Sequence, residues 1–149
     1  MYQVPLNIIK LLNKEKVENE TIIYENKNFI LLIDIKNTKK IFHYTAWYKH
    51  NIPSLEYANH IVLMHIKDLR KELIKENIIN DSSNTFIHYP PRFYRLHIHF
   101  VNNNHIHTAP IVEVYDIDRI EKYLDNKFLR NLFNPLSSRS SIRFSKCSA

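Results

Sequence analysis

Two histidines and an arginine alternate with apolar residues in the segment Arg95-Leu96-His97-Ile98-His99-Phe100. Successive side chains of a strand point to opposite faces. The spacing therefore predicts a strand with Arg95, His97 and His99 on one face and the apolar side chains on the other, packed against a core. Imidazole exchanges protons near neutral pH, whereas guanidinium is a permanent cation. Such a row is suited to binding and attacking a phosphate ester.

Zinc binding is a competing use of histidines spaced in this way, because histidines at i and i+2 of a strand can chelate the metal. The candidates are His88, His97, His99, His105 and His107. No cluster of acidic or cysteine ligands accompanies them, and His105 and His107 follow an asparagine turn, where exposed loop polarity explains them. We therefore expect no metal and no other cofactor. A half-buried strand with a polar outer face and no function is the simplest alternative.

Composition limits the classes of protein that fit. The chain has 149 residues, of which 44% are hydrophobic and 24% charged, which indicates one globular domain. It contains no glycine, which excludes the glycine-rich phosphate loops of nucleotide-binding folds. No apolar run is long enough for a membrane span, and no signal peptide is evident. With a single cysteine, Cys147, we expect a cytoplasmic or nuclear protein without a disulfide.

The formal net charge of +6 is concentrated at the C-terminal end. From residue 127 onward there is no acidic residue, and the basic residues are Lys127, Arg130, Arg139, Arg143 and Lys146. Clustered cations attract polyanions, so we predict RNA binding at these five positions. We divide the chain into a domain of residues 1–134 and a basic, serine-rich tail of residues 135–149. A solvated disordered end is the alternative for the tail.

Periodicity predicts an α+β domain with an antiparallel sheet. Helices are expected at Leu6–Lys14, Ser54–Asn77, Asp116–Asp125 and Lys127–Phe133, with Ser54 as the N-terminal cap of the second. Strands are expected at Thr21–Tyr24, Phe29–Ile35, Thr85–Tyr89 and Phe93–Val101, with Asn26–Asn28 and Asn102–Asn104 as turns. The segment Ile41–Tyr48 fits either a strand or a helix. Its histidine, His43, is interpreted as a surface or interface polar residue.

Several short motifs, in the same order along the chain, resemble the scavenger mRNA-decapping enzymes, the histidine-triad branch that hydrolyses short cap remnants. They are Ile22-Ile23-Tyr24-Glu25-Asn26, Ile33-Asp34-Ile35-Lys36, Ile52-Pro53-Ser54-Leu55 and the segment from Phe86 to Val101. The resemblance covers roughly residues 8 to 110. It implies a histidine-triad-like antiparallel sheet with one long helix and shorter flanking helices.

The resemblance also implies roles for individual residues. His97 matches the histidine that attacks the scissile phosphate and forms a nucleotidyl-histidine intermediate, and His99 matches the phosphate-contacting histidine. Arg95 stands at the first histidine of the triad. The implied nucleotide-binding residues are His88, Lys36, Asp34 and Glu18, and we add Arg92 as a further cation.

Two positions depart from the family pattern. The first triad histidine is Arg95, which can donate hydrogen bonds but not accept them. It therefore cannot set the tautomer of a neighbouring ring as histidine can, and its charge is expected to lower the pKa of His97. The tryptophan that stacks on methylguanine falls at or next to Ile8, and nothing in the sequence places Trp47 or Tyr2 at that site. From the resemblance we expect the family's N-terminal lobe, which closes over the cap, to be largely missing.

Two functions remain open at this stage. The first is a phosphoanhydride hydrolase of the scavenger-decapping type, acting on cap remnants or dinucleoside polyphosphates. The second is a catalytically impaired descendant that binds RNA or a ribonucleoprotein such as the ribosome. The resemblance further implies a homodimer, and we place the exposed part of the apolar stripe from Leu55 to Leu73 at its interface.

Overall fold

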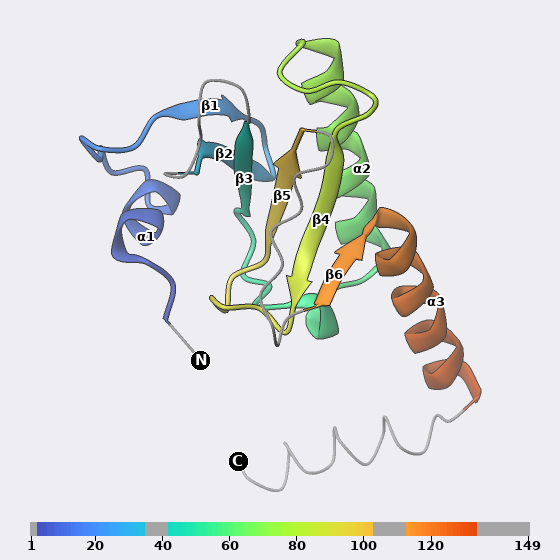
Figure 1. The fold of residues 1–149 in the computed structure, drawn as a ribbon. Coiled ribbons are helices and arrows are strands. Elements are labelled where there is room, and N and C mark those ends of the chain that lie inside the picture. The colour runs from blue at the N-terminus through green and yellow to red at the C-terminus, as the bar shows by residue number, and fades with distance from the viewer. Residues whose placement is uncertain (1–2, 35–41, 103–112, 134–149) are drawn as a thin grey trace, which may run out of the picture.

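The computed structural model describes residues 3–34, 42–102 and 113–133, and a six-stranded sheet forms its centre (Figure 1). The strand order is β1-β2-β3-β5-β4-β6, and each neighbouring pair is antiparallel. The strands are β1 (Ile22–Glu25), β2 (Phe29–Ile33), β3 (His43–Tyr48), β4 (Asn84–Tyr89), β5 (His97–Val101) and β6 (Glu113–Asp116). The helices are α1 (Leu6–Leu12), η1 (Leu55–Tyr57), α2 (His60–Lys75) and α3 (Ile117–Phe133). The predicted α+β fold with an antiparallel sheet is confirmed.

The two faces of the sheet have different coverings. Helices α2 and α3 pack against one face and enclose the main core, to which β5 contributes the fully buried Ile98 and Phe100. The short helix α1 covers part of the other face, where a second cluster joins Ile8 and Leu11 to Ile30, Leu32 and Trp47. Because side chains alternate along a strand, His97 and His99 lie on the α1 side, as the spacing predicts.

The long helix begins later than the sequence indicates. A 3-10 turn, η1, is followed by the extended residue Ala58, and α2 starts at His60. Ser54 makes no capping bond; its hydroxyl donates to Glu56 instead. The cap is Asn59, whose side-chain oxygen accepts from the backbone N–H groups of Ile61 and Val62. Asparagine and serine are equally good caps. Asn59 is used because the extended residue Ala58 separates η1 from the helix that follows.

Removal of this cap is expected to destabilise the fold. Asn59→Ala leaves two backbone N–H groups of α2 without their acceptor, at a cost of about 1 kcal/mol in the free energy of unfolding. Asn59→Asp keeps the acceptor and is expected to keep the stability. Urea denaturation of the three proteins measures the difference. Equal stabilities for Asn59→Ala and the wild type would show that the cap contributes nothing.

The predicted break between two C-terminal helices is absent, since α3 runs without interruption from Ile117 to Phe133. Ile120 and Leu124 anchor it in the main core. Lys127 falls at the expected break, but its ammonium group donates to the carbonyl oxygens of Glu56 and Ala58, which ties the helix to η1. No proline or glycine interrupts this stretch, so the helix continues.

The proposed interface on the apolar stripe is wrong. Its members, Leu55, Ala58, Val62, Ile66, Leu69 and Leu73, are each no more than 5% exposed and belong to the main core. They therefore stabilise the monomer and leave no exposed part for a partner, and the homodimer itself stays a prediction.

Asparagine side chains form turns in this glycine-free chain. In the β1–β2 hairpin the side-chain oxygen of Asn26 accepts from the backbone N–H groups of Asn28 and Phe29, which confirms the predicted turn. At the end of α2, Asn77 adopts a φ of 57°. Asn102 lies next to β5 and accepts from the backbone of Phe42, and the rest of the predicted Asn102–Asn104 turn lies outside the described residues.

Within the described ranges, no helix is both long and apolar enough to cross a membrane.

Candidate active site

His97 and His99 are held by the centre of the sheet. β5 runs between β3 and β4, with Trp47 opposite His97 and both Thr45 and Phe86 opposite His99. The two histidines are 9% and 8% exposed, and their ring centroids lie 5.3 Å apart. The strand begins at His97, four residues later than predicted.

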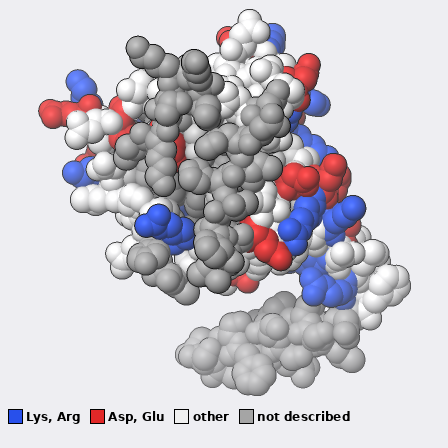
Figure 2. Space-filling view, viewed as in Figure 1, with Lys and Arg blue, Asp and Glu red and all other residues white. Residues whose placement is uncertain are grey.

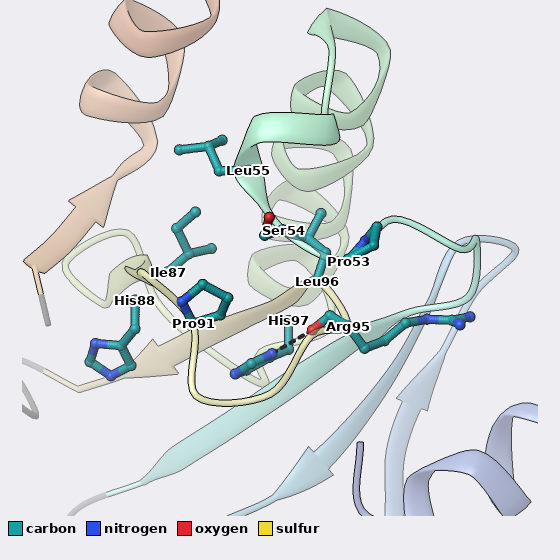
Figure 3. A pocket seen from close by; sticks show the side chains of 9 residues that line it. All are labelled: Pro53, Ser54, Leu55, Ile87, His88, Pro91, Arg95, Leu96 and His97. Atoms are coloured by element: carbon teal, nitrogen blue, oxygen red, sulfur yellow. Dashed lines mark hydrogen bonds between the residues drawn. The ribbon is translucent and has the colours of Figure 1, made fainter. Parts of the chain in front are cut away.

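The main chain fixes the tautomer of His97. Its Nδ1 lies 2.7 Å from the carbonyl oxygen of Arg95 (Figure 3). A carbonyl can only accept, so Nδ1 carries the proton and Nε2 of the neutral ring has a lone pair. The sequence predicts that the Arg95 side chain cannot set this tautomer as a histidine would, and in the structure the backbone carbonyl of residue 95 sets it. Because the backbone carbonyl is present with any residue at 95, replacement of the first triad histidine by arginine leaves this hydrogen bond in place.

Burial keeps His97 uncharged. The pKa of His97 is lowered from 6.5 to about 4, mainly by desolvation, while the hydrogen bond to the Arg95 carbonyl opposes the shift and the nearby charge of His88 adds to it. Trp47 stacks on the ring at a centroid distance of 4.4 Å. The lowered pKa was expected, but its main cause is burial rather than the Arg95 cation. At neutral pH the ring is in the form that a nucleophile requires.

His99 lies in a group of aromatic rings. Phe86 stacks on it at 5.4 Å, and the ring of His88 approaches edge-on at 4.8 Å. Its Nδ1 lies 2.8 Å from Nε2 of His43, and that atom of His43 lies 3.8 Å from a carboxylate oxygen of Asp34. Three of the predicted site residues, His88, His99 and Asp34, are therefore close together.

The interpretation of His43 as a surface residue is wrong, since the side chain is 4% exposed and contacts His99. A signal was present in the sequence. His43, Thr45 and Trp47 alternate with Tyr44, Ala46 and Tyr48, which is the period of a strand, and Trp47 and His97 are partners in the register. The pairing that brings His43 to His99 is non-local, however, and no local pattern specifies it.

Arg95 does not continue the histidine strand. Its Nε donates to the Tyr48 carbonyl at 2.9 Å and an Nη donates to the Lys49 carbonyl at 2.6 Å. Figure 3 shows its guanidinium pointing away from the ring of His97. The side chain thus clamps the end of β3 to the segment before β5. The geometry gives it this structural part, and a catalytic role for Arg95 stays a prediction.

Loss of the clamp is expected to cost about 2 kcal/mol of unfolding free energy, because two hydrogen bonds from a charged donor disappear. Arg95→Met keeps the aliphatic stem and removes the donors. Arg130→Met is the matched control on the exposed surface of α3 and is expected to change stability by less than about 0.5 kcal/mol. Urea unfolding of both variants distinguishes the two expectations, and equal effects would argue against the clamp.

The other predicted binding residues are exposed at the surface, on α3 or outside the described residues. Glu18 is exposed in the segment between α1 and β1, and Arg92 is exposed, with its guanidinium 5.4 Å from the Phe93 ring centroid. Lys36 lies outside the described residues, as do Arg139, Arg143 and Lys146. Lys127 and Arg130 lie on α3, where Lys127 is engaged with backbone carbonyls.

On the face shown in Figure 2, basic and acidic side chains are interspersed near α2 and α3. The ion pairs Lys67–Glu121 and Arg119–Glu113 agree with this mixture. RNA binding stays a prediction, and three of its five residues, Arg139, Arg143 and Lys146, lie outside the described residues.

Two hollows flank Arg95. A cavity of about 10 Å³ lies between the 53–55 turn and β5, with His88 and His97 in its wall. A groove of about 530 Å³ lies on the other side, between α1 and the end of β3. Its lining residues are Gln3, Val4, Ile9, Leu12, Asn13, Lys49, Asn51, Tyr94 and Arg95. The small cavity has room for about one water molecule, whereas the groove has the size of a small-molecule site.

Ile8, one of the positions implied for cap stacking, is not open to a ligand, whereas the adjacent Ile9 is exposed and lines the groove. Ile8 is 6% exposed and packs in the cluster beneath α1. Trp47 belongs to the same cluster, is also 6% exposed and stacks on His97. Neither side chain is presented to a methylated base.

Among the described residues, which do not include His105 and His107, no group of three or more His, Cys, Asp or Glu side chains is arranged to hold a metal ion.

Comparison with known proteins agrees with this arrangement. Residues 8–112 match the family model described as scavenger mRNA decapping enzyme C-term binding. The chain belongs to this scavenger decapping family. It is also 30% identical over 114 residues to the m7GpppX diphosphatase of Caenorhabditis elegans, an alignment that covers 68% of this chain. The chain spans only 37% of that relative's length. The match contains the histidine strand and its neighbours and ends before α3, so the family is established for the part that carries the site.

Proposed function

We propose that this scavenger decapping family member hydrolyses a phosphoanhydride bond in cap remnants or dinucleoside polyphosphates through a nucleotidyl-histidine intermediate. One observation carries the proposal. The hydrogen bond from His97 Nδ1 to a backbone carbonyl, in a site where burial lowers the pKa of His97 to about 4, gives a neutral ring with a lone pair on Nε2. This is the form that attacks phosphorus.

The reaction has two displacements. Nε2 of His97 attacks one phosphorus, the new N–P bond forms, and the anhydride P–O bond breaks so that one nucleotide leaves. Water then attacks the same phosphorus and gives up one proton to the solvent, the N–P bond breaks with its electron pair returning to Nε2, and neutral His97 is restored. Hydrogen-bond donors placed next to the phosphorus offset the negative charge that develops on its oxygens. The described candidates are His99, beside His97, and His88, beside His99.

The remainder of the substrate requires a binding surface next to His97. Asp34, Lys36 and Glu18 are the proposed nucleotide-binding residues, and Arg92 is a further cation for phosphate. The groove beside Arg95, which none of the three described members of this set lines, offers a second surface, with amide, cationic and aromatic side chains next to the residue whose carbonyl holds His97. We assign it to the nucleoside on the far side of the scissile phosphate.

The tail, the oligomeric state and the location of the protein belong to the same proposal. We assign Arg139, Arg143 and Lys146 to contacts with the phosphates of an RNA fragment, in a homodimeric cytoplasmic protein. Phosphate contacts weaken as salt concentration rises. Neutralising the three residues is therefore expected to weaken RNA binding at low salt and to flatten its salt dependence.

A substrate panel tests the function. The purified protein is incubated with a methylated cap dinucleotide, an unmethylated guanosine dinucleotide and a diadenosine polyphosphate, and the products are separated by chromatography. Cleavage of at least one compound supports the hydrolase, and the order of the rates shows whether burial of Ile8 has removed the preference for the methylated base. If no compound is cleaved, the hydrolase is rejected in favour of the RNA-binding descendant.

A further inference from the structure

The neighbour of His99 on β3 decides which of its two nitrogens carries the proton. Nε2 of His43 and Nδ1 of His99 are 2.8 Å apart, and the ring centroids are 5.0 Å apart with an interplanar angle of 62°. Two imidazole nitrogens at this distance share one proton, so one ring donates and the other accepts. Only two arrangements of the neutral pair are possible. In the first, His43 donates and His99 is protonated on Nε2. In the second, His99 donates from Nδ1.

The Asp34 carboxylate favours the first arrangement. A carboxylate oxygen of Asp34 lies 3.8 Å from Nε2 of His43, and its negative charge stabilises a proton on that atom. The Thr45 hydroxyl lies 3.5 Å from Nδ1 of His99, and because a hydroxyl can donate or accept it is compatible with either arrangement. His43 and His99 are both more than nine-tenths buried, so bulk water does not compete freely for these atoms.

We propose that His43 is a positioning residue that holds His99 in the Nε2–H tautomer, so that His99 presents a hydrogen-bond donor to the substrate phosphate. That the donor contacts a substrate phosphate rests on the function proposed above. The tautomer of His99 does not, because it is a property of the protein without substrate. It gives the two adjacent histidines of β5 complementary states. The Arg95 carbonyl leaves a lone pair on Nε2 of His97, and His43 leaves a proton on Nε2 of His99.

The residue that sets the tautomer of His99 therefore comes from β3 and not from the histidine strand β5. Arg95 replaces the first triad histidine and turns its guanidinium to Tyr48 and Lys49. His43 enters from the neighbouring strand at the opposite end of the histidine pair, next to His99.

The direct test is the tautomer of His99 in the wild-type protein. Nitrogen-15 imidazole shifts measured near pH 7, with His99 assigned by comparison with His99→Gln, distinguish a protonated Nε2 from a protonated Nδ1. We expect the Nε2–H form for His99 and the Nδ1–H form for His97. A protonated Nδ1 in His99 would overturn the proposal, whether or not the protein has any hydrolase activity.

Three variants separate positioning from packing. The amide of His43→Gln can still donate to His99, His43→Glu can only accept, and His43→Leu can do neither. We expect the Nε2–H form to persist in His43→Gln and to be lost in His43→Glu. Thermal melting shows which variants fold, and the wild-type spectrum decides the question even if only His43→Gln does.

The kinetic expectation follows the same order. His43→Gln is expected to keep kcat within about threefold of the wild type, and His43→Leu to lower it about 100-fold, as loss of a single donor to a developing oxyanion does. Equal kcat values for His43→Gln and His43→Leu would overturn the positioning role. An Nε2–H signal in a protein without turnover would instead reject the hydrolase and retain the tautomer assignment.

Discussion

Asparagine in place of His97 is expected to lower turnover of the cleaved dinucleotide by at least about 10⁴-fold, because loss of a covalent nucleophile removes most of the rate enhancement. The asparagine amide can still donate to the Arg95 carbonyl, as Nδ1 of His97 does. It has no group that corresponds to Nε2. His97→Asn therefore removes the nucleophile with little change to the local hydrogen bonding, and the variant is expected to fold.

A second histidine variant controls for nonspecific effects. His60 lies at the start of α2, is half exposed and pairs with Asp125 at 2.7 Å. His60→Asn is expected to retain wild-type turnover. If His97→Asn retained more than a tenth of the wild-type kcat while remaining folded, His97 would not be the nucleophile.

The protein is expected to lose about 3 kcal/mol of stability through His97 alone as the pH falls from 6.5 to 4. The pKa of this histidine is about 4 in the folded protein and 6.5 when it is free of the fold. The unfolded chain therefore binds a proton in this range before the folded protein does, and protonation favours unfolding. Well above pH 6.5 both states are neutral at this position, so its contribution is then complete and constant.

Comparison with His97→Asn isolates this contribution. The free energy of unfolding is measured by urea denaturation at pH 7 and pH 4 for both proteins. The stability of the wild type relative to His97→Asn should be about 3 kcal/mol lower at pH 4 than at pH 7. A difference between the two proteins that does not change with pH would mean that His97 is not desolvated in the folded protein.

The part of the site that the sequence predicts depends on local periodicity. His97 and His99 share a face, and Ile98 and Phe100 share the other, because alternation along a strand determines both. Alternation does not predict the position of Arg95, two residues before His97, because its side chain does not join the two histidines. There the backbone of Leu96 is bonded to Ile52 and Tyr48, and the Arg95 side chain finds carbonyl acceptors across the fold.

The start of α2 and the continuity of α3 show the same limit. Ser54 and Asn59 are both good caps, and Ala58 separates them with an extended backbone that no local signal requires. In α3 the polar run Asp125-Asn126-Lys127 resembles a break, but contacts with the core and with η1 keep it helical. Contacts between distant segments decide these points, as they decide the partner of His43.

The most direct test of the central proposal is detection of the covalent intermediate on His97. The protein is mixed with the dinucleotide that it cleaves fastest, quenched within milliseconds at alkaline pH, where phosphohistidine linkages survive, and analysed by mass spectrometry of the intact chain and of its peptides. We predict a mass increase of one nucleoside monophosphate unit on the peptide that contains His97, which is absent in His97→Asn. Turnover without any such adduct, or an adduct that persists in His97→Asn, would contradict attack by His97.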